Sequence, residues 1–187
     1  MVILGMHIGD TEDINFYKKE KLWARLWQTR PIFLPIFMCY HISMKVISKS
    51  LVDTEEIAKN FVEKLSFGVH ENACVVGLYG DLGSGKTTFT KAVAKILGAK
   101  ENITSPTFVI EKIYSVSHSF FTKLVHIDAY RLESPEELKR LSWNETLVNP
   151  KNLILVEWPE NVFDILPENH MKINFKFVSE NEREIEI

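Results

Sequence analysis

The sequence contains little cysteine, glycine or proline, and each shortage excludes a class of protein. Its two cysteines, Cys39 and Cys74, lie far apart without a Cys-x-x-Cys spacing, which excludes a disulfide scaffold and favours reduced thiols. Eight glycines and seven prolines are too few for a collagen-like or low-complexity chain. With 45% hydrophobic and 25% charged residues, the 187-residue composition is globular and predicts one ordinary domain.

The sequence also lacks an excess of basic charge and a long apolar run. Its formal net charge is −3, so contact with RNA would have to be local or made through a partner. No stretch reaches the roughly 18 apolar residues of a transmembrane helix. The nearest candidate, residues 32–42, contains Pro35 and His41, and acidic residues precede it, which argues against a signal peptide. We therefore expect a cytoplasmic protein with no membrane partner.

Regular patterning begins at Met44 and divides the chain in two. Residues 1–43 show no sustained period, and Pro31 and Pro35 interrupt their apolar run. We expect an N-terminal extension over residues 1–43 and a folded domain over 44–187. Two explanations of the extension stay open. Either Met44 is the true start and the extension is mis-assigned or poorly ordered, or residues 18–26 form a genuine appended helix.

From Met44 onward the pattern predicts an α/β domain. Short apolar, β-branched runs are typical of buried strands, and alternating runs near the end of the chain predict a closing hairpin. We expect one helix after a predicted capping box at Asp53-Thr54-Glu55-Glu56, one over residues 88–97, and one that begins at an N-cap at Ser134. The predicted strands cover residues 45–51, 73–79, 108–116, 123–128, 153–156, 171–178 and 183–187.

A glycine-rich turn separates a predicted strand from a predicted helix and matches the Walker A pattern Gly-x4-Gly-Lys-Ser/Thr. Glycines there allow backbone N–H groups to point inward at phosphates, and the helix N-terminus adds its dipole. Lys86 would supply charge to the β- and γ-phosphates, and the Thr87 hydroxyl could ligate Mg²⁺. Because no Asn-Lys-x-Asp motif is present, ATP is favoured over GTP. The residues expected to bind the nucleotide are Gly80, Asp81, Leu82, Gly83, Ser84, Gly85, Lys86, Thr87 and Thr88.

Two acidic residues at the ends of predicted strands are candidates for the carboxylate that completes the site. Glu157 closes a strongly apolar run and is the better candidate by pattern, whereas Asp128 ends a weaker one. His126, Asp128 and Tyr130 would share one face of an extended chain, which suits a metal or water-positioning role. The alternative is a polar cluster that caps the next helix. We expect Mg²⁺ ligands among Thr87, Asp128 and Glu157, and the acid that positions water stays open.

Five motifs occur in order: residues 80–88, Ser105-Pro106-Thr107, His126-x-Asp128-x-Tyr130-Arg131-Leu132, Glu136-Glu137-Leu138 and Glu157-Trp158-Pro159. Together they resemble the TsaE (YjeE) family, the small ATPase of bacterial tRNA threonylcarbamoyladenosine synthesis. The resemblance covers roughly residues 44–187. It implies a single P-loop NTPase domain with a central, mostly parallel sheet flanked by helices.

The resemblance also implies a function and roles for particular residues. The protein would bind and hydrolyse ATP with Mg²⁺ as a partner-activated ATPase, cycling a complex of TsaB- and TsaD-type subunits. It would be required for threonylcarbamoyl modification of adenosine 37 in tRNAs reading ANN codons, and would meet tRNA only through that complex. By position, Lys86, Asp128 and Glu157 would be catalytic, Thr107 would belong to a loop that senses the γ-phosphate, and Trp158 would lie beside the nucleotide. By its residue type alone, Trp158 could be an ordinary packing residue.

One segment departs from the family pattern. Residues 142–151 replace a glycine-containing acidic stretch, which leaves the partner-contact surface open. A small-molecule kinase is the alternative function, although no arginine-bearing lid is evident after the P-loop helix. A nucleotide-gated binding module without important hydrolysis is a third hypothesis. Arg131 is the one motif arginine that could contribute to catalysis.

Overall fold

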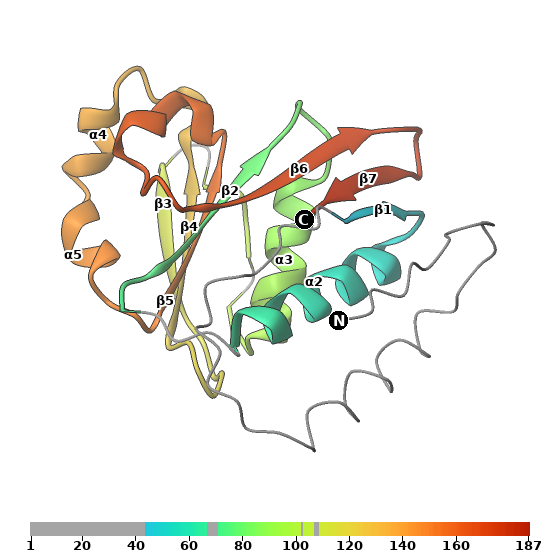
Figure 1. Ribbon diagram of the computed structural model, residues 1–187, viewed down its shortest axis with the longest axis horizontal. Helices are drawn as coiled ribbons and strands as arrows, with labels where there is room; N and C mark the ends of the chain where they lie inside the picture. Colours follow the sequence, from blue (N-terminus) through green and yellow to red (C-terminus); the bar gives the residue numbers. More distant parts are fainter. Residues whose placement is uncertain (1–43, 67–70, 102, 107–108) are drawn as a thin grey trace, which may run out of the picture. The chain divides into compact units, whose positions relative to one another are not determined.

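The computed structural model describes residues 44–187 except 67–70, 102 and 107–108 (Figure 1). The expected N-terminal extension over residues 1–43 therefore lies outside the described residues, and the boundary at Met44 stays a prediction. Within the described part of the chain, no helix is long and apolar enough to cross a membrane.

A single sheet organises the described residues, with seven strands in the order β1-β7-β6-β2-β5-β4-β3. The central strands β6, β2, β5 and β4 run parallel, whereas β1, β7 and β3 pair antiparallel at the edges. The mostly parallel sheet expected from the sequence is confirmed. The strands are β1 (Lys45–Ser48), β2 (Cys74–Tyr79), β3 (Glu111–Ser115), β4 (Lys123–Asp128), β5 (Asn152–Glu157), β6 (Met171–Phe177) and β7 (Arg183–Glu186).

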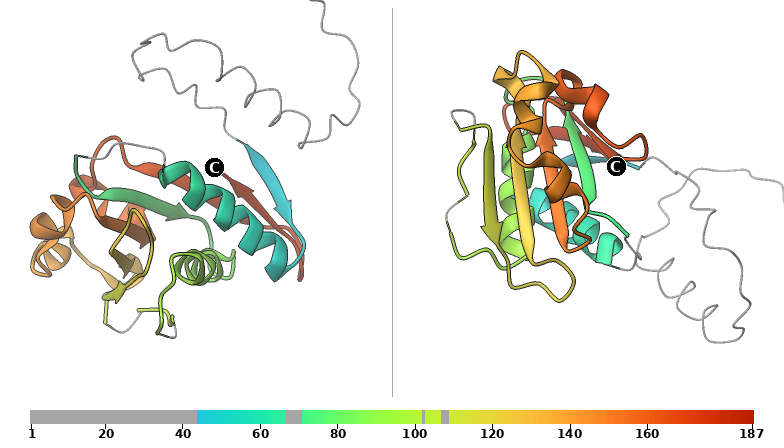
Figure 2. Two further views of the ribbon diagram at one scale, coloured as in Figure 1. Left: turned by 90° about the horizontal axis from the view of Figure 1, so that it is seen from below. Right: turned by 90° about the vertical axis from the view of Figure 1, so that its left-hand side faces the viewer.

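Helices cover both faces of this sheet (Figure 2). The longer helices α2 (Leu51–Ser66) and α3 (Lys86–Ile96) pack on one face. The short helices α4 (Pro135–Lys139) and α5 (Trp143–Leu147) pack on the other, together with the 3₁₀ segment η2 (Pro159–Ile165). A 3₁₀ turn, η1 (Ala129–Arg131), follows β4 directly.

Alternation along the central strands divides the core between the two faces. On β2, Val76 packs beneath α2 and α3, whereas its neighbour Val75 packs beneath the short helices. On β5, Leu155 likewise packs on the side of α2 and α3, and Val156 packs on the side of the short helices. Every residue of β5 is buried. A strand that is buried on both faces needs a continuous apolar run, and the sequence of β5 provides one.

Several predicted element boundaries are wrong: the strand predicted over residues 45–51 ends at Ser48, and the helix predicted over residues 88–97 begins at Lys86. Two further differences have a clear local cause. Helix α2 begins at Leu51 because the Ser50 hydroxyl accepts the Asp53 amide at 3.1 Å, while the Asp53 carboxylate accepts the Lys49 amide at 2.8 Å. Ser50 is thus the N-cap, and Asp53 lies in the first turn. Strand β3 begins only at Glu111, because the amide of Ile110, with a φ of 66°, closes a turn onto the Pro106 carbonyl.

Candidate functional site

The P-loop leaves the carboxyl end of β2 and leads into α3. Gly80, at a φ of 131°, passes so close to β6 that an added Cβ would lie 2.1 Å from the Phe175 carbonyl oxygen. Gly85, at a φ of 108°, is the N-cap of α3. Both positions require glycine, because L side chains disfavour these angles and because no room exists at Gly80. The loop therefore ends at a helix N-terminus, as phosphate binding requires.

Lys86 is the first residue of α3, and its side chain folds back over the P-loop. It is 4% exposed, and its Nζ donates hydrogen bonds to the carbonyl oxygens of Gly80 and Asp81, at 2.5 and 2.8 Å. The ring of Trp158 lies against the ammonium, 4.0 Å from Nζ to the ring centroid. Burial lowers the pKa of Lys86, and the negative charge of Glu157 opposes that shift. The ammonium group is thus held beside the P-loop by two neutral carbonyl oxygens and by the face of one aromatic ring.

Thr87 and Glu157 meet directly beside the loop. The Thr87 hydroxyl donates to the Glu157 carboxylate, 2.8 Å from Oε1 and 2.9 Å from Oε2. Glu157 is 3% exposed and is the last residue of β5, opposite Leu78 in the parallel pairing with β2. Parallel strands end at the same edge of a sheet, so this pairing brings a distant carboxylate next to the P-loop threonine.

His126 and Asp128 approach the same place from β4. Fully buried His126 donates from Nε2 to Glu157 Oε1 at 2.8 Å, and its Nδ1 has no partner among the described residues. Asp128 lies beside Glu157 in the sheet register, accepts the Tyr130 amide at 3.1 Å and accepts the Ser105 hydroxyl at 3.3 Å. Asp128 is thus part of a polar cluster that caps η1, one of the two interpretations left open by the sequence.

Tyr130 does not share an extended chain with His126 and Asp128, because it lies in η1 and is 51% exposed. The prediction that an extended chain orients all three residues is therefore wrong for Tyr130. Its ring instead packs against Trp158, with ring centroids 5.0 Å apart. Trp158 follows β5 at a φ of 57°, a left-handed conformation that is uncommon for a bulky residue.

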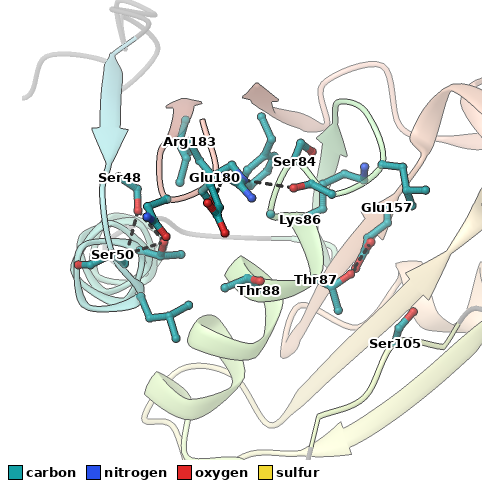
Figure 3. Close-up of a pocket in the computed structure, with 18 of the residues that line it drawn as sticks. Ser48, Ser50, Ser84, Lys86, Thr87, Thr88, Ser105, Glu157, Glu180 and Arg183 are labelled. Carbon is teal, nitrogen blue, oxygen red and sulfur yellow. Dashed lines mark hydrogen bonds between the residues drawn. The ribbon is translucent and has the colours of Figure 1, made fainter. Parts of the chain in front are cut away.

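Most of the residues described above, His126 and Gly80 excepted, line a pocket of about 460 Å³ (Figure 3). Thr87 and Glu157 lie toward one end, and Ser48 and Ser50 toward the other, where β1 meets α2. Three further lining residues come from the turn between β6 and β7 and the start of β7, namely Glu180, Asn181 and Arg183. The pocket thus brings together residues of β1, the P-loop and the β6–β7 hairpin, which lie far apart in the sequence.

Most of the predicted nucleotide-binding residues line this pocket. Gly80 and Asp81 are not among the lining residues, and their carbonyl oxygens accept hydrogen bonds from Lys86. Thr107 lies outside the described residues. Sequence reasoning missed the contributions of the β1–α2 junction and of the hairpin, which carry no phosphate-binding motif. The predicted residues that line the pocket are Leu82, Gly83, Ser84, Gly85, Lys86, Thr87, Thr88, Asp128, Glu157 and Trp158.

The donor set beside the P-loop fits Mg²⁺. Among the described residues, no group of three or more histidine, cysteine or acidic side chains could hold a metal by itself. Mg²⁺ is usually bound through one or two carboxylates together with substrate phosphates and water, so it needs no such cage. The Thr87 hydroxyl and the Glu157 carboxylate are hard oxygen donors at hydrogen-bond distance from each other.

The strand, glycine loop and helix, with their parallel central sheet, define an α/β domain of the P-loop NTPase fold. The profile of the family described as "Threonylcarbamoyl adenosine biosynthesis protein TsaE" matches residues 48–185. The chain therefore belongs to the TsaE family.

Named relatives and a solved structure agree with this membership. The chain is 37% identical to "tRNA threonylcarbamoyladenosine biosynthesis protein TsaE" of Rickettsia bellii, over 73% of this chain and 91% of that protein. It is 36% identical to the protein of the same name from Bacillus subtilis, over 76% of this chain and 85% of that one. The crystal structure of YdiB from Bacillus subtilis matches at a TM-score of 0.53 and 31% identity, covering 79% of this chain and 86% of YdiB.

Proposed function

We propose that this chain is an ATP-binding and ATP-hydrolysing accessory protein of tRNA threonylcarbamoyladenosine biosynthesis. It would cycle a complex of TsaB- and TsaD-type subunits in the cytoplasm and would reach tRNA only through that complex. Relatives that carry the name of this pathway support the biological role. The single observation that carries the chemistry is the contact between the Thr87 hydroxyl and the Glu157 carboxylate at the P-loop.

That contact is what a metal-dependent phosphate site needs from its protein. A threonine hydroxyl that donates its proton to a fixed carboxylate keeps its oxygen lone pairs available for a cation. Glu157 and Thr87 would hold Mg²⁺, and Asp128 lies close enough in the sheet register to join them or to orient water. Bound Mg²⁺ supplies divalent charge to the phosphate oxygens.

Lys86 would supply the remaining positive charge at the reacting phosphate. Its Nζ donates to two P-loop carbonyls, and exchange of these for phosphate oxygens would give stronger, charge-assisted hydrogen bonds. The Trp158 ring lies against the ammonium and is itself packed by Tyr130, which would limit the access of water on that side. The polar end of the pocket at Ser48 and Ser50 would take the nucleoside.

The test is Mg-ATP turnover of the full chain, alone and with the cognate TsaB- and TsaD-type pair. We expect slow turnover alone, faster turnover with the pair, and loss of both in Lys86→Ala. Lys91→Ala is the matched control, because Lys91 is an exposed lysine on the same helix. Multi-turnover tRNA modification that is undiminished by Lys86→Ala would refute the requirement for an ATP cycle. ATP turnover that is unchanged by the TsaB- and TsaD-type pair but rises when small phosphoacceptors are added would favour a kinase instead.

A second variant separates binding from hydrolysis. Glu157→Gln keeps a hydrogen-bonding side chain at the end of β5 but removes the negative charge that would hold Mg²⁺. If hydrolysis resets the partner complex, this variant should form an ATP-dependent complex yet support only a single round of modification. Continued multi-turnover modification would show that ATP binding alone gates the partner.

A further inference from the structure

Arg183 joins two walls of the pocket that are far apart in sequence. It is the first residue of β7, and its Nε donates to the Gly83 carbonyl oxygen in the P-loop at 3.1 Å. Its Nη1 donates to the carbonyl oxygens of Ser179, Glu180 and Glu182 in the hairpin turn, at 2.6, 3.3 and 2.9 Å. One guanidinium therefore holds the turn and the loop together.

Among the described residues, little else supports the P-loop around Gly83. An added Cβ there would meet no described atom within 4 Å, and the neighbouring Leu82 is 81% exposed. The base of the loop is different, because Gly80 lies against the Phe175 carbonyl and Lys86 bonds to two loop carbonyls there. The apex of the loop is thus held from the hairpin side, and Arg183 provides the hydrogen bond that does so.

The arginine itself is fixed by packing rather than by an opposite charge. Its guanidinium carbon lies 4.5 Å from the centroid of the Phe177 ring, and its methylene groups lie next to Gly85. Within the described residues, no carboxylate lies within ion-pair distance of the guanidinium, and the groups that accept its hydrogen bonds are neutral backbone carbonyls. Among the residues that the structure describes, its positive charge therefore has no ion-pair partner. Arg183 lies at the edge of the P-loop and lines the pocket (Figure 3).

We propose that Arg183 is a positioning residue for phosphate binding, which acts by holding the apex of the P-loop against the β6–β7 hairpin. The inference rests on the proposed nucleotide function and names a residue for it outside the Walker A segment. A loop that is already held in its binding conformation loses less conformational entropy when phosphate binds. Arg183 should therefore raise affinity for phosphorylated nucleotides and leave affinity for the bare nucleoside unchanged.

The first experiment compares ligands that differ only in phosphate. In the full chain we would measure the Kd of Mg-ATP, Mg-ADP and adenosine by titration calorimetry for wild type, Arg183→Met and Arg183→Lys. Lys176→Met is the matched control, since it removes an exposed cation from the same hairpin. For Arg183→Met we expect a loss of about tenfold to a hundredfold for ATP and ADP, the effect of one charge-assisted hydrogen bond. Arg183→Lys should recover part of it, because an ammonium can still donate to Gly83.

The second experiment needs no nucleotide. Amide hydrogen exchange of residues 82–85 should be faster in Arg183→Met than in wild type, with β2 unchanged and with equal melting temperatures in the two proteins within a few degrees. Equal exchange in the loop, or equal weakening for adenosine and ATP, would overturn the inference. If wild type fails to bind Mg-ATP or Mg-ADP, the proposed function fails, and the exchange measurement still decides whether Arg183 holds the loop.

Discussion

His126 offers a quantitative test of how the buried carboxylate of the site is held. The histidine is fully buried, and Nε2 donates to Glu157 Oε1 at 2.8 Å, while Nδ1 has no partner among the described residues. His126→Leu removes the donor but fills much of the same volume. A hydrogen bond to a charged group contributes about 1.5–3 kcal/mol. Leucine also removes the buried, unpartnered Nδ1, whose loss is stabilising and offsets part of this effect. We therefore expect the free energy of unfolding to fall by about 1–2 kcal/mol.

In a protein of this size, that loss lowers the melting temperature by about 3–6 °C. His126→Gln is the control, because its amide nitrogen can occupy the place of Nε2 and donate to Glu157. Its melting temperature should stay within about 2 °C of wild type. The assays are thermal unfolding and urea titration of the full chain. Equal destabilisation by leucine and glutamine would refute the reasoning, because the loss would then come from the imidazole ring and not from the hydrogen bond.

Three further predictions follow from burial and backbone angles. Burial raises the pKa of the Glu111 carboxyl, so the folded state binds that proton more readily than the unfolded state does. The free energy of unfolding therefore falls as pH rises through the raised pKa. Glu111→Gln should increase the urea midpoint at pH 7 and leave it unchanged at pH 4. Burial raises the pKa of Cys74 to about 12, so in a Cys39→Ser chain we expect no reaction with a thiol reagent at pH 8 until urea unfolds the protein. Gly80→Ala should lower the free energy of unfolding by about 3 kcal/mol or more, because the added Cβ would overlap the Phe175 carbonyl oxygen. Gly83→Ala should lower it by about 1–2 kcal/mol, because only its left-handed backbone angle is unfavourable for alanine. Similar losses for the two variants in urea titration would contradict this.

Local pattern predicted the elements of the fold well where each signal lies within a few residues. The apolar run at β5 and the alternation of the closing hairpin predicted their strands, and the Walker A pattern predicted a helix directly after the glycine turn, although that helix begins at Lys86 and not at residue 88. Errors arose where a cap or turn decides a boundary. The start of α2 depends on which hydroxyl accepts which amide, and the start of β3 depends on the left-handed Ile110. Periodicity carries no information on either choice.

The sequence by itself determined the conformation of the P-loop, because glycine allows the positive φ angles found at Gly80, Gly83 and Gly85. Only the tertiary structure decided which carboxylate meets Thr87, since both Asp128 and Glu157 end strands and the β2–β5 register brings Glu157 into contact. The same holds for Arg183, which reaches Gly83 across 100 residues of chain. Such contacts depend on strand order and register, which are set by burial over the whole sheet and not by any single segment.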